Sequence, residues 1–133
     1  YGDYLGIGAG AHGKRTAADT IWRTRKPRQP ERYMASAGDG ITAAALRLPV
    51  APAERAFEFM LNALRLVQGF PLTLFEARCG LAADTLRDPL ERARALGLLT
   101  QRGVWVQPTA QGLRFLNDLQ ALFLPATTVC APA

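Results

Sequence analysis

The chain has 133 residues, of which 49% are hydrophobic, and its net charge is +5 at neutral pH. This composition is typical of a globular protein, and the length is sufficient for one ordinary domain. No apolar run approaches the roughly 20 residues that span a bilayer, and no signal peptide is visible. The two cysteines, Cys79 and Cys130, exclude a disulfide framework and a four-thiolate cluster, which favours a reducing, cytoplasmic setting.

The chain opens with an apolar segment that leads into closely spaced glycines. Residues 5–7 are predicted to end a buried strand, because they are apolar and precede Gly8, Gly10 and Gly13. Such an opening is typical of the middle of a domain, so we expect a C-terminal fragment of a longer protein. Residues 20–23 predict a second, exposed strand.

Two less regular segments follow. Residues 26–31 contain two prolines and several charges, which predicts a loop. Residues 35–52 are predicted to be a linker, with one helical turn or short strand over residues 41–48.

Regular helical patterning begins after Pro52. Apolar residues then recur at helical spacing until Gly69, which predicts an amphipathic helix with the core face Phe57, Met60, Leu61, Leu64 and Val67. Thr73 and Glu76 have the spacing of a capping box, which predicts a short helix that ends at Gly80.

A third helix is predicted to start at Asp84 or, preferably, at Asp88 with Pro89 as its first residue. It would end at Gly97, with Leu86, Leu90, Ala93 and Leu96 on one face.

The remaining pattern predicts a hairpin and a last helix. Residues 98–101 and 104–107 flank Arg102 and Gly103, which is typical of a two-residue hairpin turn. Leu96, Leu98, Leu99 and Trp105 are expected in the core. Thr109 is expected to cap a helix whose apolar stripe contains Leu113, Leu116, Gln120 and Phe123, and residues 126–133 are expected to form a frayed tail. The order helix, short helix, helix, hairpin, helix is that of a winged helix-turn-helix.

Residues 8–14 match two phosphate-binding patterns only in part. The spacing of Gly8, Gly10 and Gly13 fits a dinucleotide-binding turn, but the rest of such a fold does not follow. Lys14 fits a phosphate loop, yet Arg15 stands where Ser or Thr would bind magnesium. A strand-end turn at the rim of a ligand site is the favoured interpretation, with His12 as a hydrogen-bonded loop residue.

Positive charge is concentrated in the first part of the chain. Residues 1–53 hold eight basic and four acidic residues, and residues 54–133 hold eight and seven. The segment from Arg23 to Arg32 fits a nucleic-acid arm, a solvated loop or a site for an anionic small molecule. The predicted recognition helix carries Asp84, Asp88 and Glu91 beside three arginines, which does not favour phosphate contact. We therefore expect this domain to act in packing or as a lid, with DNA binding as the alternative.

Three ordered blocks resemble the oxygen-independent coproporphyrinogen III oxidase-like proteins, a family of radical S-adenosylmethionine proteins, and within it the branch of haem chaperones. The first block is residues 1–14, from Tyr1 to the Gly-Ala-His-Gly-Lys string. The second is residues 57–66 with Phe75, Glu76, Gly80 and Leu81. The third is residues 97–99, Pro108, Thr109, Gly112, residues 115–120, Phe123 and Leu124.

This resemblance implies an α+β chain: residues 1–34 as the last strands of a radical S-adenosylmethionine barrel, 35–53 as a connector and 54–125 as a winged-helix-like domain. It implies that an upstream barrel binds a 4Fe–4S cluster and S-adenosylmethionine, and that haem or a porphyrinogen is the ligand. Neither Cys79 nor Cys130 matches the cluster motif, so we expect no catalytic or metal-binding residue here and no activity of the fragment alone. Gly8, Gly10, Ala11 and, less directly, His12 are implied neighbours of S-adenosylmethionine. The resemblance favours the chaperone over the oxidase.

Overall fold

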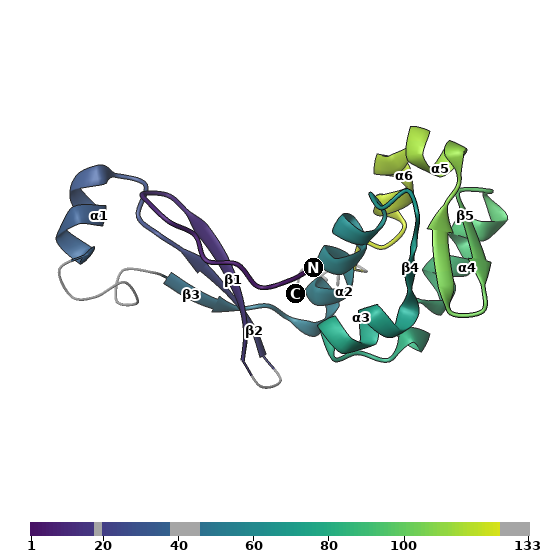
Figure 1. Ribbon diagram of the computed structural model, residues 1–133, viewed down its shortest axis with the longest axis horizontal. Coiled ribbons are helices and arrows are strands. Elements are labelled where there is room, and N and C mark those ends of the chain that lie inside the picture. The colour runs from purple at the N-terminus through teal and green to yellow at the C-terminus, as the bar shows by residue number, and fades with distance from the viewer. Residues whose placement is uncertain (18–19, 38–45, 126–133) are drawn as a thin grey trace, which may run out of the picture. The chain divides into compact units, whose positions relative to one another are not determined.

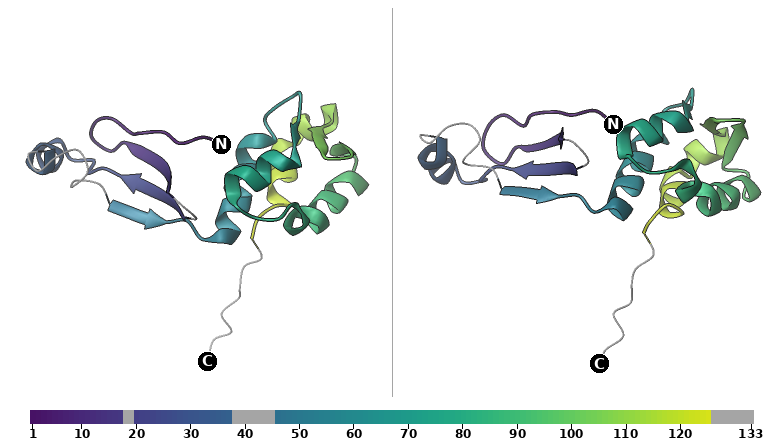
Figure 2. Two further views of the ribbon diagram at one scale, coloured as in Figure 1. Left: turned by 60° about the horizontal axis from the view of Figure 1, so that its bottom comes forward. Right: turned by 90° about the horizontal axis from the view of Figure 1, so that it is seen from below.

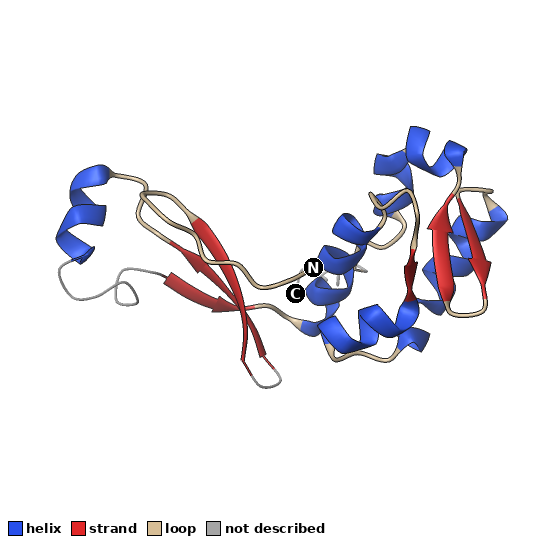
Figure 3. Cartoon of the chain, viewed as in Figure 1, coloured by secondary structure: helices blue, strands red, loops and turns tan. Residues whose placement is uncertain are grey.

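A computed structural model describes residues 1–17, 20–37 and 46–125. The chain divides into two compact units. The first, called the N-terminal unit, comprises residues 2–51. The second, called the C-terminal unit, comprises Tyr1 and the chain from Pro52 onward. Both helices and strands occur in each unit, so the α+β class predicted from the sequence is confirmed (Figure 3).

The N-terminal unit is an antiparallel sheet with one helix beside it (Figure 1). In order of the chain its elements are β1 (His12–Ala17), β2 (Thr20–Arg25), α1 (Pro30–Ala37) and β3 (Leu46–Pro49). β2 lies between β1 and β3. The strand predicted over residues 20–23 is confirmed by β2, whose β-branched and aromatic residues suit a pleated surface. Its predicted exposure is wrong, because β2 is the middle strand and Ile21 is buried.

Residues 5–7 were expected to end a strand, and this prediction is wrong. The strand begins only after the glycines, at His12, and Tyr4 forms an isolated antiparallel bridge with Lys14. Leu5 and Ile7 are 81% and 90% exposed. An apolar run becomes a strand only where a neighbouring backbone pairs with it, and here the glycine turn interrupts that pairing.

α1 is a second departure from the sequence expectation, because it occupies residues assigned to a loop and a linker. Pro30 opens the helix and Glu31 lies in its first turn. Proline has the required φ at this position, and an acidic residue suits the positive end of the helix dipole. Residues 41–48 were predicted to form one helical turn or a short strand. Residues 46–48 belong to β3, so the strand alternative is confirmed there, and residues 41–45 lie outside the described residues.

The C-terminal unit is built from helices around a small antiparallel sheet with strand order β4-β6-β5. Its elements are α2 (Pro52–Ala63), β4 (Phe70–Pro71), α3 (Leu72–Cys79), the 3₁₀ turn η1 (Ala83–Leu86), α4 (Arg87–Ala95), β5 (Leu99–Arg102), β6 (Trp105–Pro108), α5 (Ala110–Arg114) and α6 (Leu116–Ala121).

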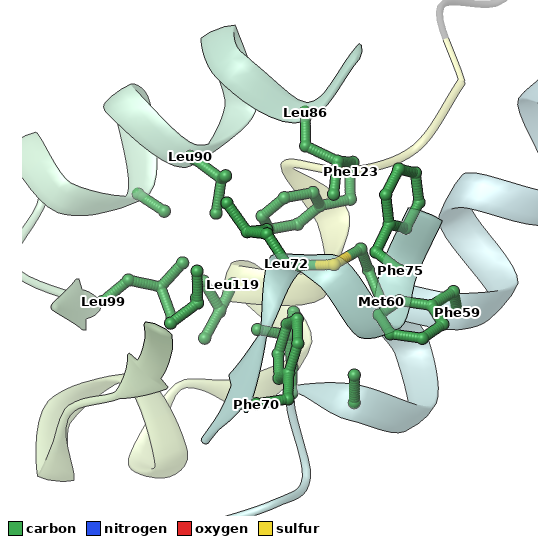
Figure 4. Close-up of a cluster of buried hydrophobic side chains, with 14 of the residues drawn as sticks. Phe59, Met60, Phe70, Leu72, Phe75, Leu86, Leu90, Leu99, Leu119 and Phe123 are labelled. Carbon is green, nitrogen blue, oxygen red and sulfur yellow. The ribbon is translucent and has the colours of Figure 1, made fainter. Parts of the chain in front are cut away.

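An apolar core holds this unit together (Figure 4). Phe59 belongs to this core and makes edge-to-face contacts with Phe70 and Phe75 at 5.5 and 5.4 Å between ring centroids. The same ring contacts Tyr1, whose hydroxyl donates to Glu58 at 2.9 Å. The edge-to-face geometry adds to the free energy gained by burying the rings.

The buried face of α2 differs from the predicted one by part of a turn. Phe59, Met60, Ala63 and Leu64 are buried, whereas Phe57 is only half-buried and Val67 is 62% exposed. The helix ends at Ala63, so Val67 belongs to the loop that leads to β4. The predicted core face therefore extends to Leu64 but not to Val67.

The capping box predicted at Thr73 is absent. The N-cap is Pro71, two residues before Thr73, so α3 begins directly after β4, and Leu72 donates its amide to the carbonyl of Val104 at 2.7 Å. Glu76 instead accepts from the amide of Ala83 at 3.0 Å. The predicted end of the helix is confirmed, because Gly80 adopts φ +65 as its C-cap.

The third helix starts at Arg87, between the two predicted positions, and follows η1. The hairpin is confirmed with a shift of one residue, because Arg102 pairs with Trp105 and the turn is Gly103-Val104. Leu98 and Leu99 are buried as expected. Leu96 and Trp105 are 57% and 44% exposed, so their assignment to the core is wrong.

Thr109 caps the last helical segment as predicted. Its hydroxyl accepts from the amide of Gly112 at 3.0 Å and donates to the carbonyl of Gly97 at 2.7 Å. The single predicted helix is divided at Phe115, where φ is −109 and ψ is 45. Gln120 is buried and donates to the carbonyl of Leu61 at 2.8 Å, which ties α6 to α2.

Among residues 1–17, 20–37 and 46–125, no helix has the length and apolarity that a membrane crossing requires.

Candidate functional site

The glycine turn, residues 6–13, is the part of the chain for which the sequence predicted a ligand role. Gly8 and Gly10 have φ values of +95 and +70, in the left-handed region that favours glycine. Ala11 is half-buried, and His12 is exposed as the first residue of β1, opposite Arg25. The structure thus places these four residues on one turn and the strand that follows it.

Backbone hydrogen bonds fasten this turn to the segment after β2. The amide of Gly10 donates to the carbonyl of Pro27 at 2.7 Å, and the amide of Lys26 donates to Ala11 at 2.9 Å. A Cβ at Gly10 would also come within 3.3 Å of the Arg28 side chain. The turn therefore has a fixed position relative to the residues between β2 and α1.

The residues before the turn lie antiparallel to β1 (Figure 2). Tyr4 and Lys14 exchange two backbone hydrogen bonds of 2.9 Å. Asp3 accepts from the amide and the hydroxyl of Thr16 at 2.8 and 2.7 Å and pairs with the Lys14 ammonium at 3.4 Å. The amide of Thr16, its hydroxyl and Lys14 together lower the pKa of Asp3 below its ordinary value.

One face of the sheet forms a hollow of about 620 Å³ beside this turn. Arg15 lies opposite Trp22 in the β1–β2 pairing, and Thr24 lies opposite Arg47 in the β2–β3 pairing. Since side chains alternate along a strand, these four project from the same face. The exposed side chains of Leu5 and Ile7 extend the apolar lining. The hollow, called the sheet hollow below, thus combines aromatic side chains and aliphatic groups with four cationic residues, Lys14, Arg15, Lys26 and Arg47.

A ligand with both apolar surface and negative charge would suit this lining. Arginine binds carboxylates and phosphates through two parallel hydrogen bonds, and it also stacks on flat aromatic groups. Ligand sites are mostly apolar, with a few polar groups that set orientation.

The residues present do not fit an iron–sulfur cluster. Such clusters are held by three or four thiolates, and the sequence contains two cysteines. Cys79 is buried in the C-terminal unit, where its thiol donates to the carbonyl of Arg55 at 3.7 Å. Across the described ranges, no three His, Cys, Asp or Glu side chains gather in a way that could hold a metal ion.

A hollow of about 300 Å³ in the C-terminal unit has a balanced charge. It is lined by Asp84, Arg87, Glu91 and Arg94 together with apolar residues of α3 and α4. Arg87 and Asp84 form an ion pair. This surface lacks the basic excess that DNA phosphates require.

Comparison with known proteins identifies the C-terminal unit. Residues 50–115 match the family model of the HemN C-terminal domain. This part of the chain is a HemN C-terminal domain. The similarity continues through the N-terminal unit, because the heme chaperone HemW of Escherichia coli K12 is 41% identical over 130 residues. The alignment covers 93% of this chain and 32% of the chaperone.

Two further relatives agree with this assignment. The heme chaperone HemW of Haemophilus influenzae is 34% identical over 93% of this chain and 31% of its own length. Coproporphyrinogen III oxidase (HemN) of Escherichia coli, a radical SAM enzyme, shares the fold with a TM-score of 0.61 at 18% identity. That match covers 91% of this chain and 28% of the oxidase. The chain therefore spans about a third of the length of its curated relatives, and its HemN C-terminal domain is preceded by a unit that they share.

Sequence reasoning found the glycine turn but missed the sheet hollow. Arg15, Trp22 and Arg47 lie on three different strands, and only the register brings them together. The sequence contains one usable signal. Arg15 and Ala17, like Trp22 and Thr24, are two positions apart and therefore lie on the same face of a strand.

Proposed function

We propose that this chain is the C-terminal part of a radical S-adenosylmethionine protein that handles haem, of the haem-chaperone branch, in the cytoplasm. The supporting observation is its 41% identity to the heme chaperone HemW over 93% of its residues. The rest of the protein would supply the barrel, the 4Fe–4S cluster and S-adenosylmethionine. The chain alone would then be inactive, since its own residues do not fit the cluster.

Within this function, the sheet hollow would hold an edge of the tetrapyrrole. Haem is flat and apolar with two carboxylates at one edge. Trp22 offers a ring for stacking, while Arg15 and Arg47 offer bidentate partners for carboxylates. The lining therefore has the chemistry for an amphiphilic dicarboxylate.

The glycine turn would lie near S-adenosylmethionine, as the sequence suggested for Gly8, Gly10, Ala11 and His12. Glycine has no Cβ, so Gly8 and Gly10 can adopt positive φ and a cofactor can approach their backbone closely. A Cβ at Gly8 would meet no atom within 4 Å. The winged-helix-like C-terminal unit would act as a cover or docking surface.

The deciding experiment uses the full reading frame, prepared anaerobically with reconstituted iron and sulfide. Haem binding is measured in one assay, and S-adenosylmethionine cleavage with coproporphyrinogen III in another. Haem binding without decarboxylated product supports the chaperone. Formation of decarboxylated product shows an oxidase instead, and absence of both contradicts the proposal.

The role of the sheet hollow is tested by substitution. Trp22→Ala is expected to weaken haem binding about tenfold or more, because stacking area and a boundary of the hollow are lost. Trp105→Ala is the matched control, since this tryptophan belongs to the C-terminal unit and is 44% exposed. His12→Ala tests whether the imidazole is an axial ligand. Equal affinity of the Trp22 variant and the wild type would show that the hollow does not bind haem.

A further inference from the structure

A second hollow in the N-terminal unit has a different chemistry. It measures about 470 Å³ and lies at the corner between β2 and α1. It is lined by Arg25, Lys26, Pro27, Arg28, Gln29, Arg32 and Leu46. Four of these seven residues are cations and none is acidic. We propose that this hollow, called the basic corner, binds a small oxyanion that carries several negative charges.

The four cations have no carboxylate partner in the part of the chain that the structure describes. Lys14 pairs with Asp3 and Arg87 with Asp84, and neither pair involves a residue of the basic corner. The ammonium of Lys26 lies over the ring of Tyr33 at 5.8 Å, which orients it without neutralising it. Like charges that line one hollow repel one another, and an anion among them would offset the repulsion.

The basic corner is also fixed in place. Lys26 and Pro27 are bonded through their backbones to Ala11 and Gly10, at 2.9 and 2.7 Å. On the other side, α1 begins at Pro30, and the first turn of a helix presents free amides and a partial positive charge. Arg32 lies in that helix and Arg28 lies just before it. The guanidinium groups therefore come from a segment that is anchored at both ends.

The composition of the corner indicates the class of ligand. Three arginines can bind phosphate or carboxylate oxygens in bidentate geometry, and the lysine adds a further charge. Four positive charges match a ligand with three or more negative charges. Pro27 and Leu46 are the apolar residues of this lining, and the exposed surface of the hollow is mostly apolar, as it is in the sheet hollow. A compact polyphosphate or polycarboxylate group fits these features. The shared chemistry is that of a multivalent oxyanion.

The basic corner is separable from the sheet hollow. Lys26 lines both hollows, but Arg28 and Arg32 line only the basic corner, and Arg15 and Trp22 line only the sheet hollow. Variants of Arg28 and Arg32 therefore test this site without altering the proposed haem contacts. Failure of one proposal leaves the other standing.

The experiment titrates the chain with pyrophosphate and with citrate at low ionic strength, followed by amide chemical shifts and calorimetry. Shift changes are expected at residues 25–32. The double variant Arg28→Gln with Arg32→Gln is expected to weaken binding at least about tenfold, since two charged contacts are lost. Glutamine keeps the Cβ and Cγ atoms, so the packing of residue 28 against Gly10 is retained.

Matched controls distinguish binding at this site from a general effect of the chain's positive charge. Arg78→Gln with Arg92→Gln removes the same two charges from the exposed surface of the C-terminal unit, and binding is expected to stay unchanged. Arg28→Lys with Arg32→Lys keeps the charge but removes the bidentate fork, so an intermediate affinity is expected. Raising the salt to about 0.5 M is expected to weaken binding by screening.

The proposal is supported if pyrophosphate or citrate binds at residues 25–32. The anion with the higher affinity then shows whether the natural ligand is a phosphate or a carboxylate. The proposal is overturned if neither anion shifts these amides, or if the control variant loses as much affinity as the test variant. It is also overturned if a short DNA duplex binds through Arg28 and Arg32 while pyrophosphate and citrate do not. That result would instead support a nucleic-acid arm.

Discussion

The ammonium of Lys14 pairs with the carboxylate of Asp3 at 3.4 Å, and the lysine side chain is 2% exposed whereas the aspartate is 45% exposed. A charge that is almost fully buried needs polar partners, because its hydration is lost. Asp3 also accepts two hydrogen bonds from Thr16. One exposed carboxylate thus fastens the start of the chain to β1 and helps the strand to bury a cation.

Replacing this carboxylate is expected to make the stability of the N-terminal unit less dependent on pH. The pKa of Asp3 is lowered in the folded state from its ordinary value of 3.8. Its contribution is therefore complete above that value and is lost as the pH falls through the lower folded pKa. Asp3→Asn should lower the free energy of unfolding at pH 7 by about 1 kcal/mol, with the difference from wild type shrinking below pH 3.8.

Urea unfolding at several pH values checks this, with Trp22 as the fluorescent probe in a Trp105→Phe background. Asp118→Asn removes an exposed carboxylate of the C-terminal unit and should leave the Trp22 transition unchanged. A difference between the Asp3 variant and wild type that stays constant down to pH 2 would contradict the assigned role.

Two glycines with similar backbone angles are expected to respond differently to alanine. Gly69 and Gly80 have φ values of +78 and +65. A Cβ at Gly69 would lie 2.3 Å from the carbonyl oxygen of Val106, whereas one at Gly80 meets nothing within 4 Å. Gly80→Ala should cost about 1–2 kcal/mol of unfolding free energy for the left-handed conformation alone. Gly69→Ala should cost about 3 kcal/mol or more, because β4 must also shift from β6.

Thermal and urea denaturation of the two glycine variants measures the difference. Similar losses of stability would show that the backbone of residue 69 can relax away from Val106, and that the steric part of the argument is wrong.

Thr109 and Thr73 form a second matched pair. The hydroxyl of Thr109 accepts from the amide of Gly112 and caps α5, whereas Thr73 is exposed within α3 and serves no cap. Thr109→Ala should lower the free energy of unfolding by about 1 kcal/mol. Thr73→Ala should be neutral or slightly stabilising, since alanine has the higher helix propensity. If the Thr73 variant were destabilised equally, the sequence-based capping box would be the better description of α3.

The C-terminal unit was more predictable from sequence than the N-terminal one because its signals are local. Helical periodicity located α2 and α4, and Thr109 and Gly80 marked the ends of helices. The errors arose where a distant partner decides the structure. Leu72 bonds to Val104, thirty-two positions away, and this pairing starts α3 before the expected cap at Thr73.

For the candidate site, sequence supplied the turn but not the surface around it. Glycine spacing predicted a turn, and Gly8 and Gly10 within it have positive φ, which depends on single residues. The hollow depends on Arg15 lying opposite Trp22 and on Thr24 lying opposite Arg47. A shift of one residue in either register would turn half of these side chains to the other face. No local pattern fixes such a register.

Hydrogen exchange is expected to separate the two units. Among the described residues of the N-terminal unit, the buried apolar side chains are Ile21 and Val50, while the C-terminal unit buries a continuous core around Phe59. A small core gives a low free energy of opening. Amides before Pro52 should therefore exchange about a hundredfold faster, relative to their unstructured rates, than those between Phe57 and Phe123.

Exchange is followed for the chain alone and for the full-length protein. If the sheet of β1, β2 and β3 is completed by the rest of the protein, its protection should rise in the full-length form while that of the C-terminal unit stays constant. Uniform protection across both units of the isolated chain would refute the expectation. It would mean that the buried Lys14, its pairing with Asp3 and the fastening of the glycine turn to Lys26 stabilise the N-terminal unit as strongly as an apolar core does.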